Sequence, residues 1–175
     1  MHGVSSDYRT IIKTLYLILK PKLYLEVGCR NGETLRTIIE STKKSNTEFH
    51  AIDIRDVKKN LPKQVIFHLG SSIDVSKKWD KEIDMLFIDA DHSADAVMQD
   101  FNIYSKWVKH NGIILLHDTF PKNEAMADLN NCGDAWKTAW EIRKKFGDEF
   151  EIVTLPIENG LSIIRKSKTQ IDWQN

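Results

Sequence analysis

The sequence contains little cysteine and no excess of charge of either sign. Cys29 and Cys132 are the two cysteines in 175 residues, and they stand far apart. This pattern fits neither a disulfide framework nor a cysteine-based zinc site, so we expect two unrelated reduced thiols. Lysine plus arginine (25) equals aspartate plus glutamate (25). Because nucleic-acid-binding domains usually carry a basic excess, we expect no nucleic acid as a partner.

Long apolar runs and leader sequences are also missing. Stretches such as "LYLIL" and "IILL" fall far short of the roughly 20 apolar residues that span a bilayer. The N-terminal "MHGVSSDYRT" lacks a basic region followed by an apolar core, so no signal peptide is evident. We therefore expect a cytoplasmic protein without a membrane partner. Because no linker rich in Pro, Gly or Ser interrupts it, the chain 1–175 is predicted to form a single domain.

Apolar runs alternate with helical patterns along the chain. Strands are predicted at 23–27, 49–54, 64–69, 83–88 and 112–117, and helices at 33–44, 72–82, 95–108 and 135–146. This alternation predicts a Rossmann-like α/β fold, with a doubly wound, mostly parallel sheet and helices on both faces. The C-terminal "FEIVTLPIENGLSIIRK" predicts an antiparallel hairpin. Another helix is predicted within 1–21, capped by Ser6 or Asp7 and stopped by Pro21.

The Gly-x-Gly-x-x-Gly fingerprint of dinucleotide-binding proteins is absent. Instead, "YLEVGCRNGETL" spaces Gly28 and Gly32 as Gly-x-x-x-Gly, at the turn from the first strand to the first helix. Open α/β sheets bind ligands at this turn. Gly28 is expected to allow a sharp turn and the close approach of a ligand. Gly32 is expected to remove a side chain where helix meets strand.

Two acids accompany this glycine loop. Glu26 precedes the loop, where a carboxylate repels a diphosphate but suits a cationic amino group. Asp53 ends the second predicted strand, where an acid can accept both hydroxyls of a ribose. Solvation of a strand end could explain either acid alone. An amine beside one strand and a ribose beside the next describe S-adenosyl-L-methionine better than NAD or ATP.

Together with "LFIDADHS" and "GIILLHDT", these motifs resemble the class I S-adenosylmethionine-dependent methyltransferases. The sequence is most similar to the small-molecule O-methyltransferase branch, which includes antibiotic-sugar O-methyltransferases and cephalosporin-hydroxylase-like proteins. The resemblance covers nearly the whole chain. It implies methyl transfer from S-adenosyl-L-methionine to a hydroxyl of a small-molecule acceptor, such as a sugar.

The resemblance also implies a set of donor-binding residues. They are Glu26, Gly28, Cys29, Arg30, Gly32, Asp53, Ser71, Ser72 and Asp89. In this set Asp53 would hold the ribose, and Ser71 and Ser72 would flank the adenine. Many relatives carry an aspartate near Ser71 for the adenine amino group, whereas "GSSID" offers hydroxyls there.

A cluster of polar residues follows the fourth and fifth predicted strands. Metal-dependent relatives hold Mg²⁺ with residues that match Asp89, His117 and Asp118, and His92 matches a base proposed in sugar-methylating relatives. Nitrogen ligands favour Mn²⁺, Fe²⁺ or Zn²⁺ over Mg²⁺, so His117 departs from the pattern. Three readings stay open: a divalent metal site, proton transfer by His92 with Asp89 at a metal-free site, and plain capping of strand ends. Asp91 contacts the donor or starts the next helix.

The segment 118–134 is long and irregular, which is typical of a substrate lid. The short N-terminal segment indicates a site that is open, completed by a second subunit of a homo-oligomer, or built for a large acceptor. A non-catalytic S-adenosylmethionine-binding or scaffold protein is the alternative function, and a nicotinamide-dependent oxidoreductase is disfavoured. We expect His50 and His68 to be packed histidines and assign the two tryptophans of helix 135–146 to the core.

Overall fold

Seven strands form one sheet in a computed structural model that describes residues 7–42, 45–128 and 130–167. The strands are β1 (Leu23–Val27), β2 (Glu48–Asp53), β3 (Val65–Leu69), β4 (Ile83–Ile88), β5 (Val108–His117), β6 (Phe150–Leu155) and β7 (Leu161–Lys166). They lie in the order β3-β2-β1-β4-β5-β7-β6. The first five strands are mutually parallel, and β7 pairs antiparallel with both β5 and β6.

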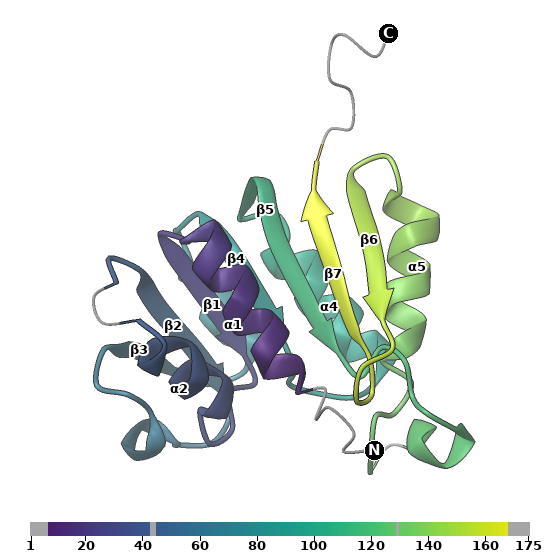
Figure 1. The fold of residues 1–175 in the computed structure, drawn as a ribbon, viewed down its shortest axis with the longest axis horizontal. Coiled ribbons are helices and arrows are strands. Elements are labelled where there is room, and N and C mark those ends of the chain that lie inside the picture. The colour runs from purple at the N-terminus through teal and green to yellow at the C-terminus, as the bar shows by residue number, and fades with distance from the viewer. Residues whose placement is uncertain (1–6, 43–44, 129, 168–175) are drawn as a thin grey trace, which may run out of the picture.

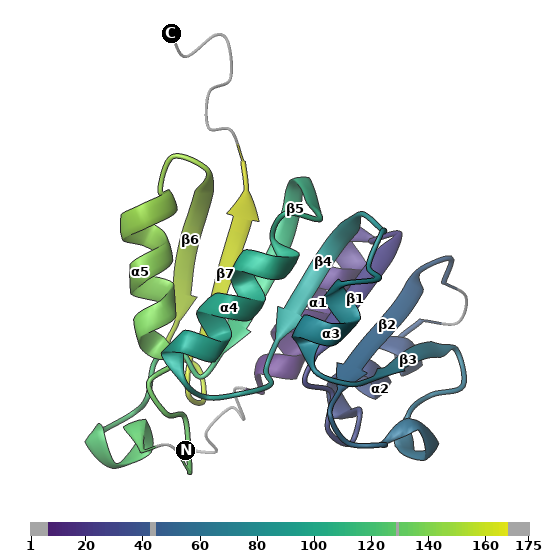
Figure 2. The ribbon, with the colours of Figure 1, turned by 180° about the vertical axis from the view of Figure 1, so that it is seen from behind.

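Helices cover both faces of this sheet. They are α1 (Tyr8–Leu19), α2 (Glu33–Glu40), α3 (Ser72–Ser76), α4 (Ala94–Tyr104) and α5 (Trp136–Phe146), with 3₁₀ turns η1 (Lys58–Asn60) and η2 (Glu124–Ala127). Figure 1 shows α1 and α2 in front of the sheet, and Figure 2 shows α3, α4 and α5 on the opposite face. The predicted Rossmann-like, doubly wound fold with a C-terminal antiparallel hairpin is therefore confirmed. In the described part of the chain, no helix combines the length and apolar character needed to cross a membrane.

The strand sequences divide the core into two layers. Alternate side chains of a strand point to opposite faces, so Leu25 packs with Leu86 under α4 while Tyr24 packs with Leu115 under α1. All five residues of β1 are buried, which explains its continuous apolar run. The one acid in that strand, Glu26, is therefore buried as well.

Three predicted helices are shorter than the sequence pattern indicated. The first, α2, ends at Glu40, because the Ser41 and Thr42 hydroxyls donate hydrogen bonds to backbone carbonyls of its last turn. The weak helix at 72–82 is reduced to the five residues of α3. The third, α4, ends at Tyr104, and placing Val108 on its apolar stripe was wrong, because Val108 pairs with Ile83 in the sheet.

Both ends of α1 follow their predicted signals. The Asp7 carboxylate accepts a hydrogen bond from the Arg9 backbone N–H, so Asp7 is the N-cap, while Ser6 lies outside the described residues. The helix ends with Lys20 in the left-handed conformation (φ 48°), directly before Pro21. The start of α1 is thereby fixed on the front face of the sheet.

The predicted burial of the two tryptophans in α5 was wrong. Trp136 is 40% exposed and Trp140 is 57% exposed. The amino groups of Lys137 and Lys144 lie 5.7 and 5.0 Å from their respective ring centroids, so each indole carries a cation on its face. The periodicity that places both rings on one helix face was correct, but it could not say which face meets the sheet.

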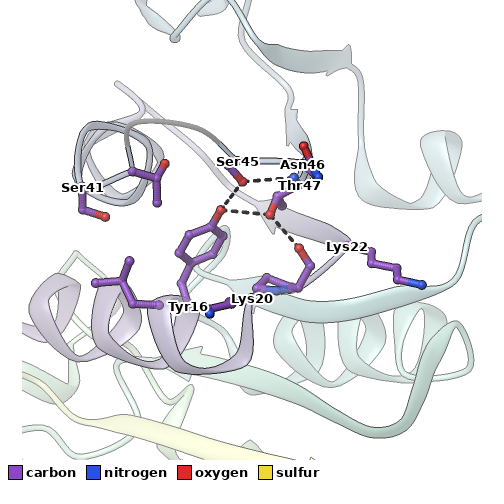
Figure 3. A pocket seen from close by; sticks show the side chains of 10 residues that line it. Tyr16, Lys20, Lys22, Ser41, Ser45, Asn46 and Thr47 are labelled. Atoms are coloured by element: carbon purple, nitrogen blue, oxygen red, sulfur yellow. Dashed lines mark hydrogen bonds between the residues drawn. The ribbon is translucent and has the colours of Figure 1, made fainter.

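A cavity of about 460 Å³ lies at the amino ends of the strands, at the opposite edge from the predicted site (Figure 3). The Tyr16 hydroxyl lies 2.6 Å from Ser45 Oγ and 2.9 Å from Thr47 Oγ1, and Thr47 donates to the Pro21 carbonyl at 2.6 Å. This chain of hydroxyls ties the segment before β1 to the segment before β2. None of the predicted site residues lines the cavity.

His50 and His68 are packed side by side, as predicted. His50 is 2% exposed, its Nδ1 lies 2.8 Å from His68 Nε2, and its Nε2 lies 2.7 Å from Glu48 Oε1. The Glu48 carboxylate also pairs with Lys81, and the Trp79 ring packs edge-on against both imidazoles. Burial lowers the pKa of His50, although Glu48 partly opposes the shift. Burial also lowers the pKa of His68, and the neighbouring His50 makes a second, smaller contribution in the same direction.

This pair should make the fold sensitive to acid. Because the folded state binds the proton more weakly than the unfolded chain, stability is complete above the ordinary histidine pKa of 6.5 and declines as the pH falls through it. In thermal melts, we expect the loss of Tm between pH 7 and pH 5 to be smaller in His50→Gln than in wild type by about 3 °C or more. The exposed His110→Gln variant is the control, and an equal decline in all three proteins would refute the prediction.

Candidate active site

The carboxyl ends of β1, β2, β4 and β5 meet along one edge of the sheet. The chain runs outward from β1 to β2 and β3, then returns to β4 on the other side of β1. This reversal makes a crevice between β1 and β4, where open α/β sheets place their ligands. Gly28 and Asp89 follow these two strands, so the glycine loop and the polar cluster predicted from the sequence meet there.

Gly28 allows the two strand ends to pack closely. Its φ is 86°, and a Cβ atom there would lie 2.4 Å from both the Asp89 carbonyl oxygen and Ala90 Cα. Gly32 has a φ of 70°, and a Cβ atom there would lie 2.5 Å from a methyl carbon of Leu61. The expected contact of Gly32 with the strand was therefore wrong, because its neighbour is the segment after η1.

Gly28→Ala should destabilise the protein strongly. The new methyl group would collide with backbone atoms that cannot rotate away, and alanine also disfavours a positive φ. We expect a loss of about 3 kcal/mol in the free energy of unfolding, measured by urea denaturation. Asn31→Ala in the same loop is the control, and a Gly28→Ala loss as small as that of the control would contradict this packing.

Glu26 and Tyr24 form a buried pair at the end of β1. Glu26 is 1% exposed, Tyr24 is fully buried, and the Tyr24 hydroxyl donates to Glu26 Oε2 at 2.9 Å. Burial raises the pKa of Glu26 to about 8, with Asp89 adding to the rise and the Tyr24 hydrogen bond opposing it. A buried carboxyl with this pKa gains most from a cation placed beside it.

Asp53 ties the glycine loop to the end of β2. Its carboxylate accepts hydrogen bonds from the backbone N–H groups of Arg30 at 2.8 Å and Arg55 at 2.9 Å. Cys29 is buried, and its Sγ lies 3.9 Å from Asp53 Oδ2. Asp53, Cys29 and Arg30, which the sequence assigned to donor binding, are thus brought together.

Ser71 and Ser72 lie at the start of α3, beside the end of β2. The Gly70 N–H donates to the Asp53 carbonyl at 3.0 Å, which joins the ends of β2 and β3. Two apolar side chains are exposed at this edge, Ile54 (72%) and Ile73 (40%). A flat apolar group can cover such surface, while the serine hydroxyls supply polar contacts at its rim.

The polar cluster gathers Asp89, His92 and Asp118. One ligand atom from each residue lies within 4.8 Å of the others. Asp118 follows β5 in the left-handed conformation (φ 57°), which turns its carboxylate toward His92 Nε2 at 3.4 Å. Asp118 is 5% exposed, and its Oδ1 is buried without a hydrogen-bond donor among the described residues. A buried carboxylate oxygen without a donor fits a site that takes up a cation.

His117 lies beside this set. Its Nδ1 is 3.3 Å from Asp89 Oδ1 and 3.5 Å from Asp118 Oδ1, so it faces both carboxylates. Burial disfavours the imidazolium, but Asp89, Asp118 and Glu158 outweigh burial and raise the pKa of His117 above its usual value. The Tyr8 ring packs over this imidazole, with a centroid separation of 4.0 Å. His117 thus faces both acids, which favour its protonated form.

The chain is similar to known proteins of one family. Residues 25–119, more than half of the chain, match the family model described as a methyltransferase domain. The chain belongs to this methyltransferase family. The methyltransferase domain is also 30% identical over 111 residues to the uncharacterized protein R132 of Acanthamoeba polyphaga mimivirus. That match covers 54% of this chain and 50% of R132, so the chain spans about half the length of this curated relative.

Solved structures share the fold of the methyltransferase domain. The SAH-bound methyltransferase PaMTH1 of Podospora anserina is 21% identical with a TM-score of 0.75, over 91% of this chain and 78% of that chain. The O-methyltransferase of Bacillus cereus, in complex with SAH, is 14% identical with a TM-score of 0.72, over 95% of this chain and 83% of that chain. SAH is S-adenosylhomocysteine, the product that S-adenosylmethionine leaves after methyl transfer.

Residues 131–135, at the end of the segment after β5, pack onto His92 and the start of α4. His92 Nδ1 contacts the Asn131 carbonyl, and the Ala135 N–H donates to the His92 carbonyl at 3.1 Å. The Asp134 carboxylate accepts a hydrogen bond from the Ala94 N–H at 2.7 Å, which joins the segment to the start of α4. The predicted lid therefore fixes the His92 ring, and its movement over an acceptor stays a prediction.

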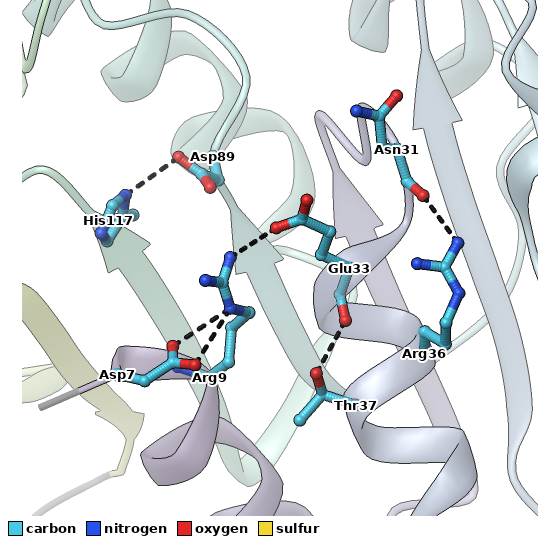
Figure 4. A network of polar contacts seen from close by, with 8 residues as sticks. All are labelled: Asp7, Arg9, Asn31, Glu33, Arg36, Thr37, Asp89 and His117. Carbon is cyan, nitrogen blue, oxygen red and sulfur yellow. Dashed lines mark hydrogen bonds and ion pairs between the residues drawn. The ribbon is translucent and has the colours of Figure 1, made fainter. Parts of the chain in front are cut away.

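The start of α1 borders the site, which the sequence gave no reason to expect. Arg9 NH1 lies 2.8 Å from Glu33 Oε2, and the Arg9 guanidinium also contacts the N-cap Asp7. Figure 4 shows this bridge beside the Asp89–His117 pair. An isolated "DYR" carries no recognisable site motif, so Tyr8 and Arg9 could be found only through the packing of α1 on the sheet.

Asp100 is a second residue that the sequence analysis passed over. It accepts a hydrogen bond from the Ser72 hydroxyl and is 5% exposed. The sequence contained a signal, because Asp100 lies among the apolar residues Val97, Phe101 and Tyr104 of the helix predicted over 95–108. A buried carboxylate in such a stripe needs a polar partner.

Proposed function

We propose that this domain transfers a methyl group from S-adenosyl-L-methionine to a hydroxyl of a small-molecule acceptor. The observation that carries the proposal is the placement of buried Glu26 and of Asp53 on either side of the Gly28 turn, with Asp89 packed against Gly28 where β1 and β4 end. Glu26 would bind the ammonium group of the donor, and Asp53 would bind its ribose. Binding of SAH by the two structural relatives supports the same assignment.

The glycine loop would lie along the methionine part of the donor. The wall of the donor site on this side would be formed by Gly28, Cys29, Arg30 and Gly32. Asp89 would lie on the opposite side of the donor. Ser71 and Ser72 would contact the adenine, with Ile54 offering apolar surface to the base. A nicotinamide dinucleotide suits this wall less well, because its diphosphate would approach the Glu26 carboxylate.

The same proposal places a divalent metal ion between Asp89, His92 and Asp118. His92 Nδ1 faces the Asn131 carbonyl, so a neutral imidazole donates from Nδ1 and directs the Nε2 lone pair toward Asp118. The Nε2 lone pair of a neutral His92 and the Asp118 carboxylate repel each other, and a cation between them would remove this repulsion. A mixed nitrogen and oxygen set favours Mn²⁺, Fe²⁺ or Zn²⁺ over Mg²⁺.

A bound divalent ion would lower the pKa of an acceptor hydroxyl and orient it. The residues of the chain would hold the donor and balance the charge of the site. Glu26 and Asp53 fix the donor, and Asp89 lies between the donor wall and the cluster. His117, packed under Tyr8, balances the charge of the two carboxylates. The acceptor would be a small hydroxylated molecule, and the domain 1–175 would act in the cytoplasm, alone or as a homo-oligomer.

Calorimetry combined with a transfer assay tests this function. Metal-stripped protein should bind SAH with micromolar affinity, and it should transfer radiolabelled methyl to hydroxylated acceptors once Mn²⁺ is added. His92→Ala should leave SAH binding within about threefold of wild type and lower transfer by about 100-fold or more. Absence of SAH binding would overturn the proposal. SAH binding without transfer to any hydroxylated acceptor would instead favour a non-catalytic binding protein.

A further inference from the structure

Both serines of the proposed adenine wall have their hydroxyl hydrogens committed to carboxylates. Ser71 donates to Asp74 Oδ2 at 2.8 Å, and Ser72 donates to Asp100 Oδ1. A hydroxyl has one hydrogen and two lone pairs, so each serine can offer further partners only an acceptor. The two carboxylates therefore make both serine hydroxyls of this wall hydrogen-bond acceptors toward a ligand.

The two contacts differ in how firmly they are held. Asp74 is exposed and lies three residues along the same short helix. Asp100 comes from α4 and is 5% exposed, so its contact with the half-buried Ser72 is less open to water than the Asp74 contact. The Tyr104 hydroxyl, one helix turn further along α4, donates to the Ser72 carbonyl at 2.7 Å. Ser72 is thus fastened to α4 through both its side chain and its backbone.

We propose that Asp100 fixes the Ser72 hydroxyl as a hydrogen-bond acceptor that reads the 6-amino group of the donor's adenine. This inference rests on the proposed function, which places adenine at Ser71 and Ser72. Adenine presents N–H donors at its 6-position, whereas hypoxanthine presents a carbonyl oxygen. A lone pair on the Ser72 hydroxyl would accept a hydrogen bond from the amino group of adenine and would repel the carbonyl oxygen of hypoxanthine. Asp100 is a positioning residue that acts through Ser72.

The protonation state of Asp100 is consistent with this role. Burial raises its pKa to about 6, with the Ser72 hydrogen bond opposing the rise. The carboxyl is therefore mostly ionised at neutral pH and can only accept. A neutral amide or hydroxyl in its place could hold Ser72 in either orientation, whereas a carboxylate allows one.

Binding of two matched nucleosides tests the inference. SAH and S-inosylhomocysteine differ only at the purine 6-position and its neighbouring nitrogen. Wild-type protein should prefer SAH by about 30-fold in calorimetric Kd. In Asp100→Ala the Ser72 hydroxyl can turn and donate, so this preference should fall to about threefold or less. Asp100→Asn should retain only part of the preference, because its amide can hold the Ser72 hydroxyl in either orientation. Asp95→Ala, which removes an exposed carboxylate of the same helix, is the matched control and should keep the wild-type ratio.

The outcomes separate this inference from the proposed function. Loss of SAH binding by wild-type protein would overturn the proposed function itself. If Ser72→Ala leaves both affinities unchanged, adenine does not lie against Ser72. If Asp100→Ala weakens both ligands equally, Asp100 has only a structural role and the inference is wrong. Should Asp100→Ala fail to fold, the ratio is measured instead in Asp100→Leu and in Ser72→Ala, which removes the hydroxyl itself at the half-buried first residue of α3.

Discussion

Glu26→Gln is expected to weaken SAH binding by about 100-fold at pH 8. The donor's ammonium group would lose a charged partner in a buried position, where charge-assisted hydrogen bonds contribute most. Glutamine keeps the size of the side chain and can still accept the Tyr24 hydrogen bond. Calorimetry with SAH measures the effect, and Glu33→Gln is the matched control because the Glu33 side chain is exposed at the start of α2.

The same substitution should change how binding and stability depend on pH. The folded-state pKa of Glu26 is about 8, against an ordinary value of 4.5. The proton on Glu26 therefore supports the unliganded fold below pH 4.5, and this contribution is lost as the pH rises through 8. Unliganded Glu26→Gln should be more stable than wild type by about 4 kcal/mol at pH 8 and equal to it near pH 4.5.

Donor binding should also release a proton from Glu26 in the wild type. The carboxylate must ionise to pair with the ammonium group, so SAH affinity should rise between pH 6 and pH 8. Calorimetric titrations in buffers of different ionisation enthalpy measure the released proton. Glu26→Gln should release none at this site. A wild-type affinity that is constant from pH 6 to pH 8 would contradict a protonated Glu26.

The fold was predictable because its signals are local and repeated. Apolar runs of strand length alternate with helical stripes, and this alternation alone selects a doubly wound sheet. Errors arose where tertiary contacts overrule periodicity. Val108 continues the stripe of α4, yet it pairs with Ile83 in the sheet. Trp136 and Trp140 share a helix face, but a stripe does not reveal whether that face meets the core or water.

The site was predictable only where one motif supplies its parts. Glu26 and Gly28 belong to one strand and its turn, and Asp89 and Asp118 end neighbouring strands. Tyr8 and Asp100 reach the site from α1 and α4, and their places depend on how those helices pack. His117 was predicted as a metal ligand, and its Nδ1 faces the carboxylates of Asp89 and Asp118. The rotamer that sets this contact follows from packing under Tyr8, which no spacing rule encodes.

Asp118→Asn is expected to separate metal binding from donor binding. Asparagine tolerates the left-handed backbone that Asp118 adopts (φ 57°), so the fold should survive the change. The site would lose one of its two carboxylates and the buried oxygen that lacks a hydrogen-bond donor among the described residues. We expect Mn²⁺ affinity and methyl transfer each to fall by about 100-fold, while SAH affinity changes by less than about threefold.

Mn²⁺ binding can be followed by electron paramagnetic resonance without any acceptor, so the metal site is tested independently of turnover. Asp95→Asn, which lies outside the cluster, serves as the control. Methyl transfer that survives both chelation and Asp118→Asn, but is lost in His92→Ala, would show that His92 removes the acceptor proton at a metal-free site. Loss of transfer in both variants together with loss of Mn²⁺ binding would instead assign His92 to the metal, since one Nε2 lone pair cannot serve as ligand and base at once.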